Sequence, residues 1–117
     1  ALHDPTEGGI ANALWELAEA SDVGIIAIDS EIPRYWESTQ LARLFDINLL
    51  GAIASGALLI AVPEPDTPDV IENLNEASME AQVIGRVVEK KQGVKMLIGS
   101  ERVELPRYST DELTRVL

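Results

Sequence analysis

The sequence feature that most constrains the fold is a short apolar run, Val23 to Ile28. The run has the length of a strand, is rich in isoleucine and is closed by Asp29. An almost continuous apolar run of this length suits a strand covered on both faces, because a solvated face would require alternating polar residues. We therefore expect an interior strand of a sheet.

Three segments carry apolar residues at helical spacing and are predicted to be helices: about Gly8 to Ala20, about Trp36 to Phe45, and Asp69 to about Ala77. In the second helix, we expect Leu41, Leu44 and Phe45 to form the inner face. In the third, Thr67 suits the N-cap and Pro68 the first helical position. These helices should pack on the sheet.

Four further strands are predicted from apolar runs between turn residues: Ala57 to Val62, Ala81 to Val88, Val94 to Ile98, and Arg102 to Leu105. The first of them is expected to be buried. Lys90 to Gly93 and Gly99-Ser100 are predicted turns, so the C-terminal half should be a meander with two hairpins. A capping box from Ser109 to Glu112 predicts a last short helix that runs to Leu117. The order of elements predicts an α/β (α+β) fold with helices packed on a mixed β-sheet.

Composition narrows the class of protein. A chain of 117 residues fits one domain with a real core. The absence of cysteine excludes disulfides, thiolate zinc sites and a cysteine nucleophile, and makes a cytoplasmic origin the default. The net charge of -11 opposes binding to nucleic acid or anionic membranes. The longest nearly apolar run, Ile47 to Val62, is too short to span a bilayer, and no signal peptide is recognisable.

The first nine residues hold most of the polar groups with a plausible chemical use. The only histidine, His3, is followed by Asp4, Thr6 and Glu7, and then by the pair Gly8-Gly9. They lead directly into a predicted helix, whose unpaired N–H groups and positive dipole end can hold an anion such as a phosphate. A chain that starts inside such a motif, without an initiator Met, is expected to be one domain of a longer protein.

The same residues have a purely structural interpretation. Asp4 is a good N-cap, and Pro5 suits the first position of a helix. The pair Gly8-Gly9 favours function, because two glycines in a first helical turn cost roughly 1 kcal/mol each relative to alanine and need a reason, such as close approach of a ligand or another domain. His3 could contact substrate or shuttle a proton, or it could be a hydrogen-bonded strut.

A second candidate segment lies in the middle of the chain. Leu49 to Ala54 is predicted to be one more helical turn that ends at Ser55-Gly56, where Gly56 would supply the left-handed stop. Ser55 is equally consistent with lining a cleft. Trp15 and Trp36 could mark a partner surface, but core or rim packing explains them as well.

Three stretches together carry a family resemblance: His3-Asp4-Pro5-Thr6-Glu7-Gly8-Gly9-Ile10-Ala11, Ala54-Ser55-Gly56-Ala57-Leu58-Leu59-Ile60-Ala61-Val62, and Val83-Ile84-Gly85-Arg86-Val87. They resemble the C-terminal domain of the aminoimidazole ribonucleotide (AIR) synthase superfamily. That superfamily includes selenophosphate synthetase, thiamine-monophosphate kinase and a hydrogenase maturation protein that dehydrates a carbamoyl group. The chain is most similar to the maturation protein and to synthase-related proteins of unassigned function.

The resemblance implies that residues 1–117 are the C-terminal domain of a two-domain enzyme that uses ATP. An absent N-terminal domain would carry most of the nucleotide and magnesium ligands and form the homodimer. The shared chemistry is phosphoryl transfer to an oxygen, often of an amide or carbamoyl group on a small molecule or a protein acceptor. This chain would be inactive alone, would hold no metal and would supply one wall of the cleft, with no catalytic residue assigned: His3, Asp4, Thr6, Glu7, Gly8, Gly9, Ser55 and Gly56.

Two departures from the maturation protein bear on function. That protein carries its substrate on a C-terminal cysteine, whereas this chain has no cysteine and ends at Leu117. Glu7 stands where the maturation protein usually has arginine, so a local charge is reversed. Two alternatives therefore stay open: a stand-alone metabolite-binding or regulatory module without catalysis, and a degenerate family member that acts only as an assembly partner.

Overall fold

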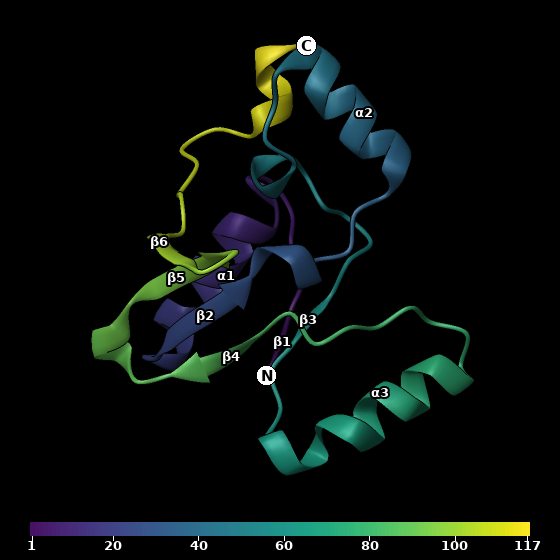
Figure 1. Ribbon diagram of the computed structural model, residues 1–117, viewed down its shortest axis with the longest axis vertical. Coiled ribbons are helices and arrows are strands. Elements are labelled where there is room, and N and C mark those ends of the chain that lie inside the picture. The colour runs from purple at the N-terminus through teal and green to yellow at the C-terminus, as the bar shows by residue number, and fades with distance from the viewer.

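The computed structural model describes all residues, 1–117, and its centre is a four-stranded mixed sheet (Figure 1). The strand order is β4-β2-β5-β6, with bounds β2 Gly24–Ile28, β4 Gly85–Val88, β5 Val94–Ile98 and β6 Glu101–Glu104. Strand β2 runs antiparallel to β4 and parallel to β5, and β5 runs antiparallel to β6. The predicted fold class, a mixed sheet packed with helices, is confirmed.

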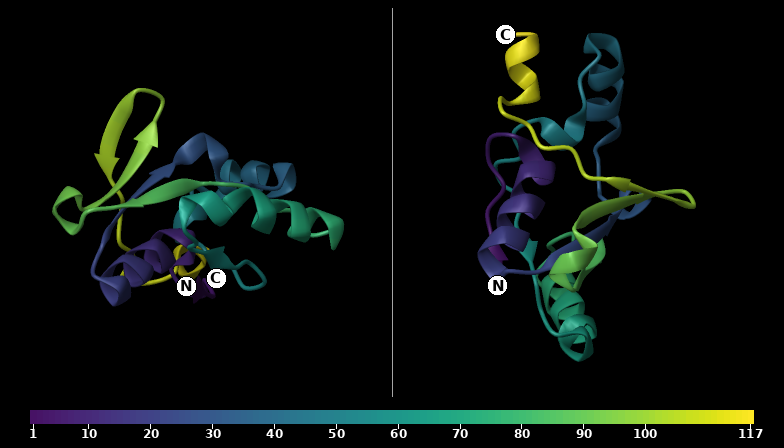
Figure 2. Two further views of the ribbon diagram at one scale, coloured as in Figure 1. Left: turned by 90° about the horizontal axis from the view of Figure 1, so that it is seen from below. Right: turned by 90° about the vertical axis from the view of Figure 1, so that its left-hand side faces the viewer.

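Strand β2 is the interior strand that its apolar run predicts. Ile25, Ile26 and Ala27 are each at most 4% exposed. Helix α1 (Gly9–Ser21) covers the face of the sheet that Ile25 and Ala27 share, and it has the predicted position (Figure 2, left). The core on that face is completed by side chains of α1, β5 and the residue after β6: Ala11, Leu14, Leu17, Ala18, Val94, Met96 and Leu105.

The first predicted hairpin is wrong. Lys90 to Gly93 connects β4 to β5, but β2 lies between those two strands, so the connection crosses the end of β2. There the backbone N–H of Ile25 donates to the carbonyl oxygen of Gly93 at 3.0 Å. The most apolar strand has taken one of the two interior positions of the sheet, where both of its edges are hydrogen-bonded. The second predicted hairpin, with Gly99-Ser100 as its turn, is confirmed.

A separate two-stranded ribbon holds the N-terminus. Strand β1 (Leu2–His3) pairs antiparallel with β3 (Leu59–Ile60). The predicted buried strand Ala57 to Val62 is therefore reduced to two residues, of which only Leu59 is buried, while Leu58 is 54% exposed. The strand is exposed because it joins this ribbon and not the main sheet, so no helix layer covers it.

Helix α2 (Trp36–Phe45) has the predicted bounds but not the predicted burial. Leu41, Leu44 and Phe45 are 55%, 74% and 51% exposed, and Ala42 is the one buried residue of the helix. The helix stands at one end of the molecule, beside the C-terminal turn and away from the sheet (Figure 1; Figure 2, right). Helical spacing identified an apolar face correctly, but no segment of this chain covers it.

Helix α3 (Thr67–Glu76) lies at the opposite end of the molecule (Figure 1). The predicted N-cap Thr67 is wrong, because a 3-10 turn at Glu64–Asp66 precedes the helix and makes Thr67 its first residue. Pro68 lies in the first helical turn, as predicted. Strand β4 is also shorter than predicted, since residues 81–84 precede it as irregular chain.

Two other predicted helical segments are short 3-10 turns. The turn η2 spans Leu49–Gly51 and stops before Gly56, so Gly56 is not its C-cap. The last turn, η5, spans Glu112–Arg115 and is capped by Asp111, whose carboxylate accepts the Leu113 N–H at 2.9 Å. The capping box led by Ser109 is therefore wrong, because the chain enters the turn two residues later.

Candidate functional site

The residues Asp4 to Gly9, which we call the motif loop, form an irregular segment between β1 and α1. The structural interpretation of Asp4 as the helix cap is wrong, because α1 begins at Gly9 and its N-cap is Gly8. Pro5 is less than 2% exposed, and its burial fixes the loop to the body of the domain. Asp4, Thr6 and Glu7 are exposed and free of side-chain hydrogen bonds, so they are the polar groups that a ligand could reach.

The two glycines of the motif loop are buried and both have left-handed backbones, with φ of 78° at Gly8 and 65° at Gly9. A Cβ on Gly9 would overlap the carbonyl oxygens of Leu50 and Ala52. A Cβ on Gly8 would overlap the side chain of Asn12. The close neighbours of the glycine pair therefore come from this chain itself, from Asn12 at Gly8 and from the η2 region at Gly9, whereas approach by a ligand or another domain stays a prediction.

The N–H groups at the start of α1 are partly satisfied within the chain. The Gly8 N–H donates to Oδ2 of Asp111 at 2.8 Å, and the Gly9 N–H donates to the Thr6 carbonyl oxygen at 3.0 Å. A carboxylate at a helix N-terminus is favoured by the helix dipole. The Gly8 N–H is thus already paired with a carboxylate from the C-terminal segment.

His3 is tied to α1. Its Nε2 lies 2.7 Å from Oε2 of Glu16, and the His3 side chain is 30% exposed. This contact is that of a strut between β1 and α1, which is one of the two readings of His3 from the sequence. No other titratable side chain is hydrogen-bonded to the imidazole.

Ser55 and Gly56 lie in an exposed turn, in which the Ala57 N–H donates to the Ala54 carbonyl oxygen at 3.1 Å. Gly56 has φ of 95°, and no atom lies near the position of a Cβ, so backbone conformation alone requires the glycine. Because β1 and β3 are antiparallel, the residues after His3 and those before Leu59 leave the ribbon at the same end. The fold therefore directs both sequence motifs to one side of the domain.

Apart from Trp15, the residues that join the C-terminal segment to α1 were not predicted from the sequence. The Asn12 side chain donates to the Tyr108 carbonyl oxygen at 2.7 Å and accepts the Tyr108 N–H at 2.8 Å. The Trp15 Nε1–H donates to the Leu105 carbonyl oxygen at 2.9 Å, and the Arg107 guanidinium lies 4.7 Å from the Trp15 ring centroid. Trp15 therefore packs within the domain. In the sequence, the residue that could have indicated this contact is Asn12, a polar residue inside an otherwise apolar helical stripe.

Tyr108 packs its ring against Gly51, where a Cβ would meet the ring at 2.6 Å. Burial raises the pKa of Tyr108 above 10.0, and the Glu112 carboxylate adds to the effect by disfavouring a second negative charge. Glu112 also accepts the backbone N–H of Asn48 at 2.8 Å. The C-terminal segment thus joins α1 to the η2 region.

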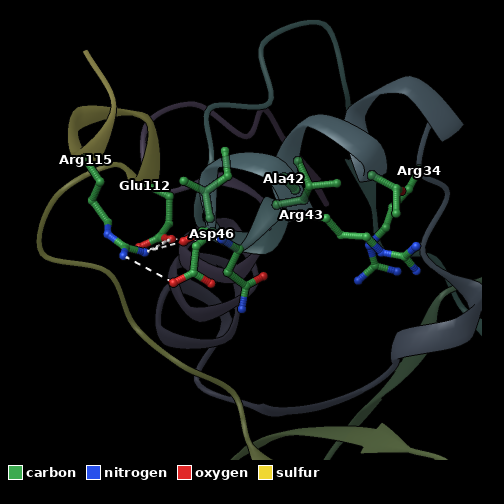
Figure 3. Close-up of a pocket in the computed structure, with 10 residues that line it drawn as sticks. Arg34, Ala42, Arg43, Asp46, Glu112 and Arg115 are labelled. Atoms are coloured by element: carbon green, nitrogen blue, oxygen red, sulfur yellow. Dashed lines mark hydrogen bonds and ion pairs between the residues drawn. The ribbon is translucent and has the colours of Figure 1, made fainter.

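A cavity of about 480 Å³ lies between α2 and the C-terminal turn (Figure 3). It contains none of the eight predicted site residues; the charged residues lining it are Arg34, Arg43, Arg115, Asp46 and Glu112. Arg34 is paired with Asp29, and Arg115 is paired with Glu112, which leaves Arg43 without an ion pair.

No group of three or more histidine or acidic side chains is placed to hold a metal ion. None of the helices has the length and apolar character of a membrane span.

A family model described as "AIR synthase related protein, C-terminal domain" matches residues 1–97. A putative hydrogenase expression/formation protein of Methanocaldococcus jannaschii is 31% identical over 110 residues, 91% of this chain and 33% of the relative. The selenide, water dikinase of the same organism is 37% identical over 83% of this chain and 28% of its own length. The carbamoyl dehydratase HypE of Escherichia coli is 32% identical over 91% of this chain and 33% of its own length.

Solved structures of HypE proteins are also similar to this chain. A crystal structure of E. coli HypE, a hydrogenase maturation protein, matches with a TM-score of 0.86 and 28% identity over 100% of this chain and 37% of that one. A structure of a HypE in complex with ATP matches with a TM-score of 0.84 at 22% identity, over 100% of this chain and 40% of that one, and shows a shared fold. The chain spans about a third or less of the curated relatives named above.

Proposed function

This chain belongs to the family of AIR synthase related protein C-terminal domains, and on that premise we propose that it is the C-terminal domain of a two-domain, ATP-dependent enzyme. The family match confirms the resemblance that the three sequence motifs indicate. The relatives are about three times longer than the matched segment, which supports an N-terminal domain as the missing partner. We place the enzyme in the cytoplasm, as expected from the cysteine-free sequence.

The proposed reaction is phosphoryl transfer from ATP to an oxygen of an amide or carbamoyl group. The names of two relatives, a carbamoyl dehydratase and a selenide, water dikinase, support this class of chemistry. The transfer would turn the oxygen into a phosphate leaving group. Catalysis of this kind depends mainly on positioning and charge stabilisation, so no nucleophile is required from this domain. The acceptor would be a small molecule or a carbamoyl group carried by a protein.

In this proposal the domain forms one wall of the ATP cleft. The observation that carries it is the β1–β3 ribbon, which directs the motif loop and the Ser55-Gly56 turn to the same side. Thr6 and Ser55 would donate hydrogen bonds to phosphate oxygens, and Asp4 and Glu7 would orient cationic groups of the substrate complex. His3 would brace the loop through Glu16.

Magnesium would enter bound to ATP and would neutralise phosphate charge. The donor set of this chain does not fit a complete metal site, because no three carboxylate or histidine side chains converge. The N-terminal domain would therefore supply most of the magnesium ligands. Asp4 and Glu7, both exposed carboxylates of the motif loop, are the groups of this chain that could add to them.

The apolar face of α2 supports a contact with another domain or subunit. Tyr35 and Trp36, at the start of α2, are 76% and 72% exposed, and Leu44, near its end, is 74% exposed. Exposed apolar patches of this kind mark interaction surfaces, because their burial is favourable. We propose that the enzyme's own N-terminal domain covers this face in a homodimeric enzyme.

A second candidate function is a metabolite-binding module without catalysis. The observation in its favour is the 480 Å³ cavity beside α2, which lies apart from the motif loop and is lined by three arginines. Because two of these arginines are already paired with carboxylates, the net positive charge there is small. We therefore rank this function second.

Amide chemical shifts distinguish the cleft wall of an ATP-dependent enzyme from the metabolite-binding module. Residues 1–117 and the full-length protein would each be titrated with ATP and magnesium. Weak shifts in residues 1–117, confined to the motif loop and the Ser55-Gly56 turn, with tight binding by the full-length protein, support the cleft wall. Tight binding by residues 1–117 alone, with shifts around Arg43, supports the module. Full-length protein that shows no shifts at the motif loop contradicts the proposed enzyme.

A further inference from the structure

Residues Leu105 to Glu112, which we call the strap, run along α1 outside the segment that the family model matches. Three hydrogen-bonded contacts join the strap to α1 in reverse order: Leu105 with Trp15, Tyr108 with Asn12, and Asp111 with Gly8. Positions 8, 12 and 15 lie on one face of a helix, since residues separated by three or four positions are neighbours. The strap therefore follows one face of α1 down to the motif loop.

Asp111 is the end of the strap that reaches the motif loop. Its Oδ2 accepts the Gly8 N–H at 2.8 Å, while its Oδ1 accepts the Leu113 N–H at 2.9 Å. Both oxygens of one carboxylate thus join the last turn of the chain to the N-cap of α1. Hydrogen bonds to an ionised acceptor are stronger than neutral ones, so this contact is well suited to hold a loop in one conformation.

We propose that the strap sets the conformation of the motif loop and that Asp111 is a positioning residue for the ATP site. The inference rests on the proposed function, in which Thr6 and its neighbours contact phosphate. Gly8 has a left-handed backbone, and the direction of its N–H fixes how the preceding residues leave the helix. A loop that is held in its binding conformation binds more tightly, because binding then has less chain to order.

The far end of the strap supports the second glycine. Glu112 accepts the Asn48 N–H at 2.8 Å, and Arg115 donates to the Asp46 carbonyl oxygen at 2.9 Å (Figure 3). These contacts hold the η2 region, whose carbonyl oxygens lie against Gly9. The same C-terminal segment therefore reaches Gly8 directly and Gly9 through η2.

The test uses the full-length protein with Asp111→Asn. Asparagine has one carbonyl oxygen and no charge, so it cannot serve both the Gly8 and Leu113 amides as the carboxylate does. We expect faster hydrogen exchange of the Gly8 amide, unchanged exchange in the middle of α1, and about tenfold weaker ATP binding, the effect of losing one charge-assisted hydrogen bond. Asp69→Asn is the matched control, since Asp69 is an exposed carboxylate of α3 without a hydrogen-bond partner.

Asn12→Ala is the second variant, because it loosens the strap at Tyr108 while leaving Asp111 in place. It should weaken ATP binding and Gly8 protection in the same direction but less. An increase in kcat or a tighter ATP Kd in Asp111→Asn overturns the inference, since the carboxylate would then occupy the place of the ligand. Unchanged Gly8 exchange overturns it as well.

If the proposed ATP site is wrong, the result differs from the result expected if the strap does not hold the motif loop. Wild-type protein that binds no ATP would contradict the ATP site, whereas Gly8 exchange in Asp111→Asn still reports directly on the strap. Circular dichroism and melting temperature of each variant show whether the domain remains folded. Loss of Gly8 protection in a folded Asp111→Asn protein supports the strap, and retained protection contradicts it.

Discussion

At the scale of single residues, Gly9 is the most constrained position of the motif loop. Its left-handed backbone excludes most side chains, and the carbonyl oxygens of Leu50 and Ala52 occupy the space of a Cβ. Both constraints come from the domain itself. A glycine that looks functional in the sequence is thus required for folding before any ligand is considered.

We predict that Gly9→Ala destabilises the domain by about 2–5 kcal/mol, the sum of left-handed strain and overpacking. Gly56→Ala is the matched control, because Gly56 also has positive φ but open space around it. It should cost only about 1–2 kcal/mol, the strain alone. Urea unfolding of both variants measures the difference, and equal losses would contradict the close packing at Gly9.

The raised pKa of Tyr108 predicts that the folded protein loses stability at high pH. Its pKa is raised in the folded state by burial and by Glu112, so the folded protein keeps the phenol proton at pH values where the unfolded chain has lost it. The contribution to stability is therefore complete below the unfolded pKa of about 10 and is lost as pH rises through the folded pKa.

Tyr108→Phe should remove this part of the alkaline destabilisation. The measurement is the free energy of unfolding of both proteins from pH 8 to the alkaline limit of folding. Because the other titrating groups are shared, the difference between the two curves isolates Tyr108. Parallel curves above pH 10 would show that the phenol ionises equally in both states.

At the scale of elements, α1 and α2 have similar apolar spacing but opposite roles. Leu14 of α1 is 3% exposed in the core, whereas Leu44 of α2 is 74% exposed. The two helices differ in burial because α1 connects directly to β2 and lies on the sheet, while α2 follows a loop and lies at one end of the molecule.

The two leucines give a matched pair of variants. Leu14→Ala should destabilise the domain by about 2–5 kcal/mol, because it leaves a cavity beside β2. Leu44→Ala should change stability by no more than about 0.5 kcal/mol in residues 1–117, since its side chain is already in water. Chemical denaturation measures both, and a large loss for Leu44→Ala would show that α2 is packed in this chain.

At the scale of the whole molecule, the exposed face of α2 predicts an inter-domain contact. Residues 1–117 contain two tryptophans, and Trp15→Phe leaves Trp36 as the single tryptophan of this segment. Trp36 is 72% exposed, so its emission in residues 1–117 should be that of a solvated indole. In the full-length protein, the emission of Trp36, isolated as the difference from the same protein with Trp36→Phe added, should shift to shorter wavelength and be quenched less by iodide. Identical spectra in the two proteins would contradict coverage of α2 by the N-terminal domain.

The sequence predicted the elements better than their partners. The bounds of α2 and β5 agree with the structure, and β2 differs by one residue, because helical spacing and apolar runs are properties of neighbouring residues. The pairing of β4 with β5 was wrong, since a short turn between two strands favours a hairpin but does not prevent a third strand from lying between them.

The candidate site was predictable in part for the same reason. The motif loop and the Ser55-Gly56 turn are recognisable from short motifs, and the family match confirms the resemblance they carry. Their arrival on one side of the domain depends on the β1–β3 pairing. The contact of Asp111 with Gly8 joins positions 103 residues apart, which no local pattern encodes.

The sequence by itself thus determined that the chain has a buried central strand and an amphipathic first helix that begins at a glycine pair, because each depends on residue spacing within one segment. Only the tertiary structure decided that β2 separates β4 from β5, that α2 is left uncovered, and that Asp111 holds the N-cap of α1. Those outcomes depend on which distant segments compete for the same neighbours, and burial and hydrogen bonding are settled only when the whole chain has packed.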